Sequence, residues 1–388
     1  MRVWIIAMLL PMLSAASAQP VVDSVTPTSR SEVRLQGSDF GAGPRVVLYD
    51  DFSAASVDGE NLTLRPLLGE WYRTRDRGAL EQGAFGPESR SLVGWNDTGL
   101  GTGSVEFGVV DPEGVHGLEH FQEIYISRTL RDLGAFPGAN ECCESFSPTS
   151  SSKHAWMMFG RRGDNTRYSV DVLGEPSGHD LVLPSWIGAT FSIAGNQTSM
   201  RPRYYQRDLE DFWDFGGWVA KMFHGKLNPA DPYGDAEGFF AFINRNGYFV
   251  NPREGRMMTD QTDEGVPYPY WDRVKISTWR RSSEADVKRV MDEVYVAIGS
   301  NANARVLLAD SPALHSATRI KHLLPSRWSD DEIVLTMPKN SVGAAEFIHS
   351  DRFQLGRALG PVESVGSYYL HVITADNQHA EAVAVGAL

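Results

Sequence analysis

Cysteine is almost absent from this chain of 388 residues, and its only two cysteines, Cys142 and Cys143, are adjacent. Neighbouring cysteines can form only a strained bridge with each other, and a chain of this length can build a core without disulfides. The sequence therefore excludes a disulfide-stapled scaffold. Long apolar runs are also missing beyond the N-terminal segment, so no transmembrane segment is expected in the remainder.

Positive charge is in short supply as well. Lys and Arg number 36 against 49 Asp and Glu, which gives a net charge of −13 at pH 7. Basic residues form no continuous stripe, so nucleic acid is not an expected partner. The chain also has no zinc-binding motif, no phosphate-binding glycine loop and no Gly-x-Ser-x-Gly elbow.

The first 18 residues have the features of a secretory signal peptide. Arg2 supplies the positive start, residues 3–13 the apolar run, and Ala16-Ser17-Ala18 the small-residue cleavage site. The apolar run is too short to cross a bilayer. The protein is therefore predicted to be secreted, either to a periplasm or to the outside of the cell.

The remaining chain reads as β structure. Short runs of β-type residues alternate with turns rich in Gly, Pro, Asn and Asp, the pattern of a β-sandwich or jelly roll. Ser283–Met291 is the only stretch that favours a helix. The clearest strand-like runs are Gly103–Val110, Phe121–Leu130, Lys153–Phe159, Gly217–His224, Asp272–Trp279 and Asp292–Ile298.

The two ends share a pattern. In the N-terminal segment, residues 19–48, a strand is followed by Gly37-Ser38-Asp39-Phe40-Gly41, and this Gly-x-x-Phe-Gly turn resembles the opening of the immunoglobulin-like IPT/TIG domains. In the C-terminal segment, residues 300–388, the runs 304–310, 328–336 and 368–375 resemble later strands of such a domain. Either the two ends fold together around an inserted middle, or an N-terminal hairpin leans on a C-terminal sandwich.

Four runs in the middle of the chain, residues 49–299, carry a second pattern together with Lys153. The runs are 123–127, 218–221, 244–247 and 292–296. Their order resembles the strand order of the concanavalin-like jelly rolls, most closely the secreted polysaccharide lyases of alginate or glucuronan type and their non-catalytic relatives. This likeness implies an all-β fold, a jelly-roll β-sandwich beside a smaller immunoglobulin-like sandwich.

This resemblance implies an acidic, uronate-containing polysaccharide as the partner, cleaved by β-elimination. The chain lacks the Gln-x-His triplet and the Tyr-x-Lys-x-Gly-x-Tyr run that many alginate lyases carry. A non-catalytic carbohydrate-binding or adhesion protein, or a structural surface protein, therefore remains the alternative.

The stretch 270–279 is the best candidate for holding a sugar acid. Read with the two-residue period of a strand, one face carries Trp271, Arg273, Lys275 and Ser277, an aromatic plane beside two cations and a hydroxyl. The repulsion between the two cations calls for an anion nearby. The alternative is an ordinary solvated face of an antiparallel sheet.

A lyase must neutralise the uronate carboxylate, remove a proton and protonate the leaving oxygen. Cations serve the first task, and Tyr, His or Lys serve the others. Each candidate also has an ordinary alternative as a buried or solvated strand residue. The predicted catalytic residues are Tyr125, His154, Lys221, Arg273 and Lys275, and the predicted substrate-binding residues are Arg128, Lys153, Tyr205, His224, Tyr270 and Trp271.

Paired carboxylates stand at the start of the first and last strands of the presumed jelly roll. Asp50 and Asp51 open one strand, and Asp292 and Glu293 open the other. Such strands are neighbours in these sandwiches, and oxygen ligands gathered there suit Ca²⁺. A structural calcium site is therefore expected, with two solvated strand ends as the alternative.

Overall fold

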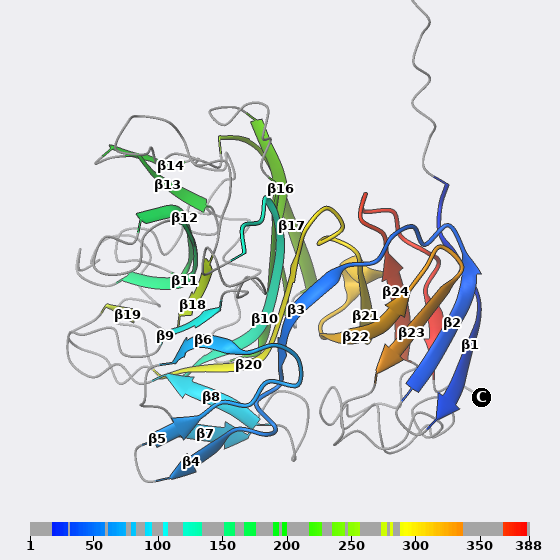
Figure 1. Cartoon of the computed structure of the whole chain (residues 1–388), viewed down its shortest axis with the longest axis horizontal. Coiled ribbons are helices and arrows are strands. Elements are labelled where there is room, and N and C mark those ends of the chain that lie inside the picture. The colour runs from blue at the N-terminus through cyan, green and yellow to red at the C-terminus, as the bar shows by residue number, and fades with distance from the viewer. Residues whose placement is uncertain are drawn as a thin grey trace, which may run out of the picture.

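The computed structural model describes residues 18–29, 32–58, 61–74, 79–82, 90–94, 104–107, 119–133, 151–159, 167–175, 189–193, 196–199, 217–226, 235–244, 247–256, 273–277, 280–281, 288–336 and 368–385. Nearly all of them belong to three large antiparallel sheets, and a two-stranded ribbon pairs β4 (Ser56–Asp58) with β5 (Asn61–Thr63). Figure 1 shows the three sheets as successive layers, which we name the outer sheet, the central sheet and the terminal domain.

The terminal domain joins the two ends of the chain. Its strand order is β1-β2-β23-β22-β21-β24-β25, with β2 paired to β23. The two ends therefore fold together, with the central and outer sheets between them in the sequence. The strands are β1 (Val21–Ser29), β2 (Glu32–Ser38), β21 (Arg305–Ala309), β22 (Ile320–Trp328), β23 (Glu332–Thr336), β24 (Tyr368–Ile373) and β25 (Val383–Val385), and a short 3-10 helix, η3 (Leu314–Ser316), follows β21.

Strand β22 makes this domain a small sandwich. Its first half pairs with β21 and its second half with β23, with a register shift between Pro325 and Arg327. A strand that switches sheets in this way forms a corner between two packed layers. The two layers enclose one hydrophobic core, to which β2, β23, β21 and β24 all contribute.

The Gly-x-x-Phe-Gly turn has a packing role in this domain. Phe40 is fully buried in the core, and a side chain at Gly37 would collide with the carbonyl oxygen of Val21. Gly41 has a φ of +66°, the left-handed region that favours glycine. Its N–H donates to a carboxylate oxygen of Asp330 at 3.0 Å, which ties the turn to the loop before β23.

The central sheet has the order β17-β16-β15-β10-β20-β8-β7, and β3 also pairs with β20. Strand β3 crosses the expected domain boundary at residues 48/49 and lies in this sheet from its first residue. The strands are β3 (Arg45–Asp50), β7 (Ala79–Gln82), β8 (Arg90–Gly94), β10 (Glu123–Leu133), β15 (Val219–Lys226), β16 (Asp235–Asn244), β17 (Gly247–Arg256) and β20 (Lys288–Ile298).

The expected helix at 283–291 is wrong where the structure describes it, because residues 288–291 begin β20. Val290 pairs with Val93 and Met291 with Leu92, and both β20 side chains are buried. Helical spacing of apolar residues in a short run is a weak signal, and strand pairing in a buried sheet overrides it.

The outer sheet has the order β14-β13-β12-β11-β18-β9-β6, with the short β19 beside β11. It lies against the central sheet as the second layer of the larger sandwich (Figure 1). The strands are β6 (Trp71–Thr74), β9 (Ser104–Phe107), β11 (Ser151–Phe159), β12 (Arg167–Glu175), β13 (Ala189–Ile193), β14 (Asn196–Ser199), β18 (Arg273–Ser277) and β19 (Arg280–Arg281).

The central sheet is covered on both faces. From Ile124 to Leu130 of β10, and from Val290 to Ile298 of β20, every residue is buried. One face of this sheet packs against the layer of the terminal domain that contains β21 and β24. The two surfaces share a second hydrophobic core, which we call the junction core. Strand β21 contributes Val306 and Leu308 to the terminal core, and Leu307 and Ala309 to the junction core.

These sheets confirm the predicted all-β fold class, a jelly-roll type of sandwich with a smaller β-sandwich. The immunoglobulin-like character of the terminal domain stays a prediction. The predicted signal peptide, apart from Ala18, and both cysteines lie outside the described residues. Within the described part of the chain, no helix has the length and apolarity needed to cross a membrane.

Because the junction core is shared, we expect the central sheet and the terminal domain to unfold together. Leu307→Ala removes a fully buried side chain from this core and should cost about 2–5 kcal/mol. Scanning calorimetry should show one transition that moves to lower temperature as a whole. Two separate transitions, with only one of them displaced by the substitution, would show that the domains are independent.

Candidate functional site

The residues expected to contact a ligand are divided between two sheets. The structure brings only some of them together. Tyr125, Arg128, Lys221 and His224 lie in the central sheet, Lys153, His154, Arg273 and Lys275 lie in the outer sheet, and Tyr205, Tyr270 and Trp271 lie outside the described residues.

Arg128 and Lys221 are direct partners on neighbouring strands of the central sheet. Their side chains are 3% and 4% exposed, and both interact with other groups. Two cations side by side in a sandwich interior need such partners, because burying an unpaired charge is costly. Both positions alternate with those that face the junction core, so they belong to the other face of the sheet.

Tyr125 lies on the junction-core face, at the start of a buried chain of polar groups. Its hydroxyl is 3.0 Å from Nε2 of His322, and Nδ1 of His322 is 3.0 Å from Oε1 of Glu293. Glu293 accepts a further bond from the Tyr49 hydroxyl at 3.2 Å and one from the His322 backbone N–H at 2.9 Å. These four residues, Tyr49, Glu293, His322 and Tyr125, form what we call the junction network.

The hydrogen bonds define the protonation of this network. The carboxylate of Glu293 can only accept, so Nδ1 of His322 carries the proton and Nε2 accepts from Tyr125. Burial is the main reason why the pKa of His322 is lowered, although Glu293 works in the opposite direction. Burial and then Glu293 hold the pKa of Tyr49 well above its usual range. The network is therefore stable with a neutral imidazole.

Arg305 closes the network on the side of the terminal domain. Its guanidinium lies 4.8 Å from the centre of the Tyr125 ring, and its Nη1 donates to Oδ1 of Asn303 at 2.7 Å. The side chain is 1% exposed. Tyr125 is thus enclosed between two domains, on the sheet face opposite Lys221, and the two residues do not converge on one ligand.

His224 lies at the end of the same face and is bound to Glu123. Nε2 of His224 is 3.1 Å from Oε1 of Glu123, and the two side chains are 9% and 6% exposed. This buried pair connects the end of β15 to the start of β10. Its geometry is that of an internal link between strands.

In the outer sheet, by contrast, the backbone register brings several predicted residues close together. Strands β11 and β18 are neighbours, with Lys275 opposite Trp156 and Arg273 opposite Met158. Val274, between the two cations, is completely buried. Successive strand residues alternate between faces, so positions 273 and 275 belong to the face opposite Val274. His154 lies two residues before Trp156 on β11, at a point where the pairing of β11 with β12 shifts its register.

The register continues as one row across the whole outer sheet. Lys275 stands opposite Glu106 on β9 as well as Trp156, and Trp156 stands opposite Asp171 on β12. Directly opposed residues of an antiparallel sheet share a face. We call this set the outer row: Arg73, Glu106, Lys275, Trp156, Asp171, Thr190 and Ser199.

The four carboxylates expected at a calcium site are engaged within the protein. Asp50 accepts from the Trp71 indole at 2.7 Å and from the Phe52 N–H at 2.8 Å. Burial raises the pKa of Asp50 to about 6. The other three are Asp51, bonded to Ser53 N and Oγ, Asp292, bonded to the Glu293 N–H, and Glu293 in the junction network.

Among the described residues, no group of three or more His, Cys, Asp or Glu side chains is placed to hold a metal. Glu293 uses its oxygens on the junction-core face, where Tyr49 and His322 contact them. Calcium binding through these carboxylates stays a prediction.

Several residues of both sites were missed by sequence reasoning. His322 and Arg305 lie in the C-terminal segment, far from their partners in the sequence, and no local pattern connects them. Trp156 lies in a strand that the sequence indicates, but the register that places it between Lys275 and Asp171 comes from strand pairing alone. The sequence signal for the outer row was Lys275, which alternates with Arg273 along one strand.

Comparison with known proteins found no matching family model and no match among curated proteins. Among solved structures, a PL-14 alginate lyase from Aplysia kurodai is similar with a TM-score of 0.35 and 10% identity, over 57% of this chain and 87% of that one. The alginate lyase vAL-1 from Chlorella virus has a TM-score of 0.31 and 13% identity, over 58% and 90%. Likenesses this distant do not assign a family or an activity.

Sugar-binding and toxin domains are similar at the same level. The binding domain of botulinum neurotoxin serotype G has a TM-score of 0.32 and 8% identity, over 84% of this chain and 73% of that one. The function must therefore be argued from the residues of this chain.

The junction network predicts different outcomes for two buried tyrosines. Tyr125→Phe leaves Nε2 of His322 without its donor and should lower the free energy of unfolding by about 1–3 kcal/mol. Tyr295 is a matched control, because it is equally buried and its hydroxyl has no hydrogen-bond partner among the described residues. Tyr295→Phe should leave stability unchanged or slightly raised, as measured by urea unfolding. Equal losses in both variants would contradict the network.

A second prediction concerns pH. The pKa of His379 is lowered to about 4, mainly by burial and then by Arg305 and His371. Such a histidine stabilises the fold above its unfolded pKa of about 6.5, and this contribution is lost as pH falls from 6.5 towards 4. His322 and His371 are lowered too, whereas the raised pKa of Asp50 acts in the opposite sense.

His379→Gln removes one of these histidines and should make stability less sensitive to acid. The measurement is the difference in unfolding free energy between pH 7.5 and pH 4.5 for the wild type and the variant. A smaller loss in the variant is expected. The same loss in both proteins would show that His379 does not titrate as described.

Proposed function

We propose that this protein is a secreted carbohydrate-active protein that binds an acidic polysaccharide on the outer sheet. The observation that carries the proposal is the register of β11 and β18, which sets Lys275 opposite Trp156, with Arg273 two residues away on the same face. An aromatic plane beside two cations suits a chain of uronate rings. The carboxylates of an acidic polymer are favourable partners for the two cations.

An acidic residue stands between two of the cations in the outer row. Lys275 stands between Trp156 and Glu106, and Arg73 stands on the far side of Glu106. Cations and acids therefore alternate at this end of the row. This arrangement favours local recognition of a carboxylate over attraction by a broad positive field, in keeping with the net charge of −13.

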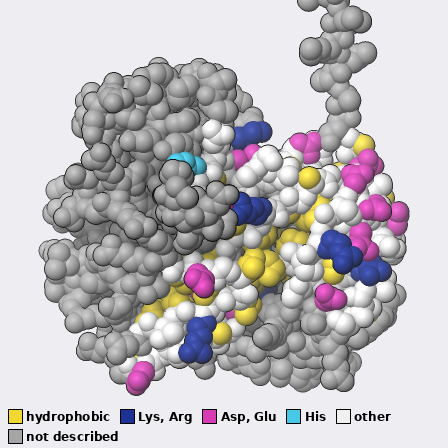
Figure 2. All heavy atoms as spheres, in the orientation of Figure 1, with side chains coloured by type: hydrophobic (Ala, Val, Ile, Leu, Met, Phe, Trp, Pro, Cys, Tyr) yellow, Lys and Arg dark blue, Asp and Glu magenta, His cyan; other side chains and the backbone are white. Residues whose placement is uncertain are grey.

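The surface of the terminal domain offers a contrast. On the face shown in Figure 2, basic side chains of this domain lie among acidic ones. Arg34 and Arg327 both contact Glu332, at 3.1 Å each. These two arginines share one carboxylate, and neither stands beside an aromatic residue in the manner of Lys275 and Trp156.

Within this proposal, the reaction is β-elimination. Arg273 and Lys275 stabilise the charge that develops on the uronate carboxylate. His154 accepts the proton as the C5–H bond breaks, a double bond forms between C4 and C5, and the C4–O4 bond breaks. A proton donor then protonates O4; Tyr168, which stands opposite Met158 in register, is a candidate on the neighbouring strand. Tyr125 has no part in these steps.

A non-catalytic binding protein is the second candidate. It would use Trp156 and the same cations and would not need His154 or Tyr168. The position of His154 at an irregularity of the β11–β12 pairing favours the enzyme, because bulges often redirect a side chain beside an active site.

A structural calcium ion near Asp50 and Asp292 remains part of the proposal.

The test combines cleavage with binding. The protein is incubated with alginate, glucuronan and hyaluronan while absorbance is followed near the unsaturated-uronate band, and its retention on immobilised polymer is measured. Lyase action predicts a rise in absorbance with at least one polymer, and His154→Ala should abolish that rise while retaining binding. Retention without any rise would favour the binding protein.

Arg273→Ala and Lys275→Ala should each weaken retention about tenfold, corresponding to about 1.4 kcal/mol. Arg327→Ala is the matched control, because it removes a surface arginine of the terminal domain that is 68% exposed. The control should bind as the wild type does. Equal binding by all three variants, or no retention on any acidic polymer, would rule out the outer sheet as the site.

A further inference from the structure

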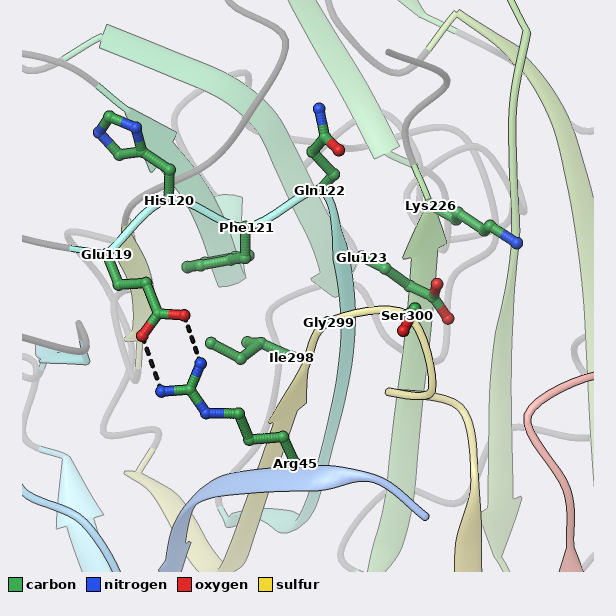
Figure 3. A pocket seen from close by; sticks show the side chains of 10 residues that line it. All are labelled: Arg45, Glu119, His120, Phe121, Gln122, Glu123, Lys226, Ile298, Gly299 and Ser300. Atoms are coloured by element: carbon green, nitrogen blue, oxygen red, sulfur yellow. Dashed lines mark hydrogen bonds and ion pairs between the residues drawn. The ribbon is translucent and has the colours of Figure 1, made fainter. Parts of the chain in front are cut away.

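A cavity of about 450 Å³ lies away from the outer sheet, at one end of the central sheet. Strands β3, β10, β15 and β20 all reach it, and the turn after β20 leads from here into the terminal domain. Ligand clefts commonly have this size and occur at domain boundaries. Its main lining residues are Arg45, Glu119, Phe121, Gln122, Ile298 and Ser300 (Figure 3).

An ion pair stands on one side of this cavity. Arg45, at the start of β3, faces Glu119, and its two terminal nitrogens both contact the carboxylate. Nη2 lies 2.7 Å from Oε2, and Nη1 is bonded to Oε1. Bidentate pairs of this kind are strong and hold a fixed plane. The hydrogen bond with Glu119 raises the pKa of Arg45. The side chains are 55% and 28% exposed, so a ligand can reach them.

The remaining charges of the cavity are not free to bind a counter-ion. Glu123 is held by His224 at 3.1 Å. Lys226 points away from the ion pair in Figure 3 and interacts with another group. Arg45 and Lys226 balance Glu119 and Glu123, and the cavity therefore has no net charge with which to select an anion or a cation.

Apolar groups form the floor. Phe121 and Ile298 are 4% and 1% exposed, and the Phe121 ring lies between the ion pair and Gln122 in the close view (Figure 3). The adjoining turn is fixed, because Gly299 adopts a φ of +88° and its N–H donates to the carbonyl oxygen of Glu123 at 3.0 Å. The cavity thus has a firm apolar base and a polar rim.

From these features we infer that the cavity is a second binding site, for an uncharged, hydroxyl-rich ligand such as a neutral saccharide. A charged ligand group would have to displace one member of the bidentate Arg45–Glu119 pair, whose hydrogen bonds are charge-assisted. A ligand hydroxyl group leaves this pair intact. It can donate to a remaining lone pair of the Glu119 carboxylate and accept from a remaining N–H of the Arg45 guanidinium. The Ser300 hydroxyl offers a further bond of the same kind.

This inference does not depend on the outer-sheet proposal. It gives the protein two recognition surfaces of different chemistry, one for acidic polymer on the outer sheet and one for neutral sugar beside the terminal domain. Substitutions in one should leave binding at the other unchanged.

The experiment measures binding of cellotriose, mannotriose and galactotriose by saturation-transfer NMR and calorimetry, with a triuronate as the charged comparison. At least one neutral sugar should bind. Arg45→Ala should weaken that binding at least tenfold, and Ser300→Trp, which fills the cavity and keeps the ion pair, should abolish it. Circular dichroism and thermal unfolding establish that each variant is folded.

Arg327→Ala removes an arginine that also pairs with a glutamate and serves as the matched control, and Lys275→Ala tests independence from the outer sheet. Neutral sugar should bind both variants as it binds the wild type. Three results would overturn the inference: no neutral sugar binds, binding survives Ser300→Trp, or the triuronate binds this cavity more tightly than the neutral sugars do.

Discussion

Burial of the central sheet on both faces is the constraint on which the rest of this structure depends. An antiparallel sheet commonly keeps one face in water, but here one face packs within the larger sandwich and the other packs on the terminal domain. Polar groups on the second face must therefore find partners inside the protein. Tyr125, His322, Glu293 and Tyr49 meet this need by bonding one another across the domain boundary.

This constraint also decides where ligands can bind. Residues of the central sheet are used for packing and internal polar bonds, including Tyr125 and the Glu123–His224 pair. We therefore propose that recognition takes place on the outer sheet and at the ends of the central strands. The outer row around Trp156 and Lys275 and the cavity beside Arg45 occupy these two places. They are proposed to differ in ligand.

The sequence predicted the all-β class because strand periodicity and turn residues are local signals. It also indicated Arg273 and Lys275 as a pair, since alternation along one strand is enough to find them. It could not show that Tyr125 faces His322, because these residues are 197 positions apart and only the packing of two domains brings them together. The helix expected before Met291 failed for a related reason, as pairing with β8 determines that segment.

Native-state hydrogen exchange tests the shared burial of the central sheet most directly. Strands β10 and β20 of the central sheet and β21 of the terminal domain pack around one junction core. The amide hydrogens of these three strands should therefore exchange together, at the free energy of global unfolding. Exchange of β21 at a clearly lower free energy than β10 and β20 would show that the terminal domain opens by itself and would contradict this account.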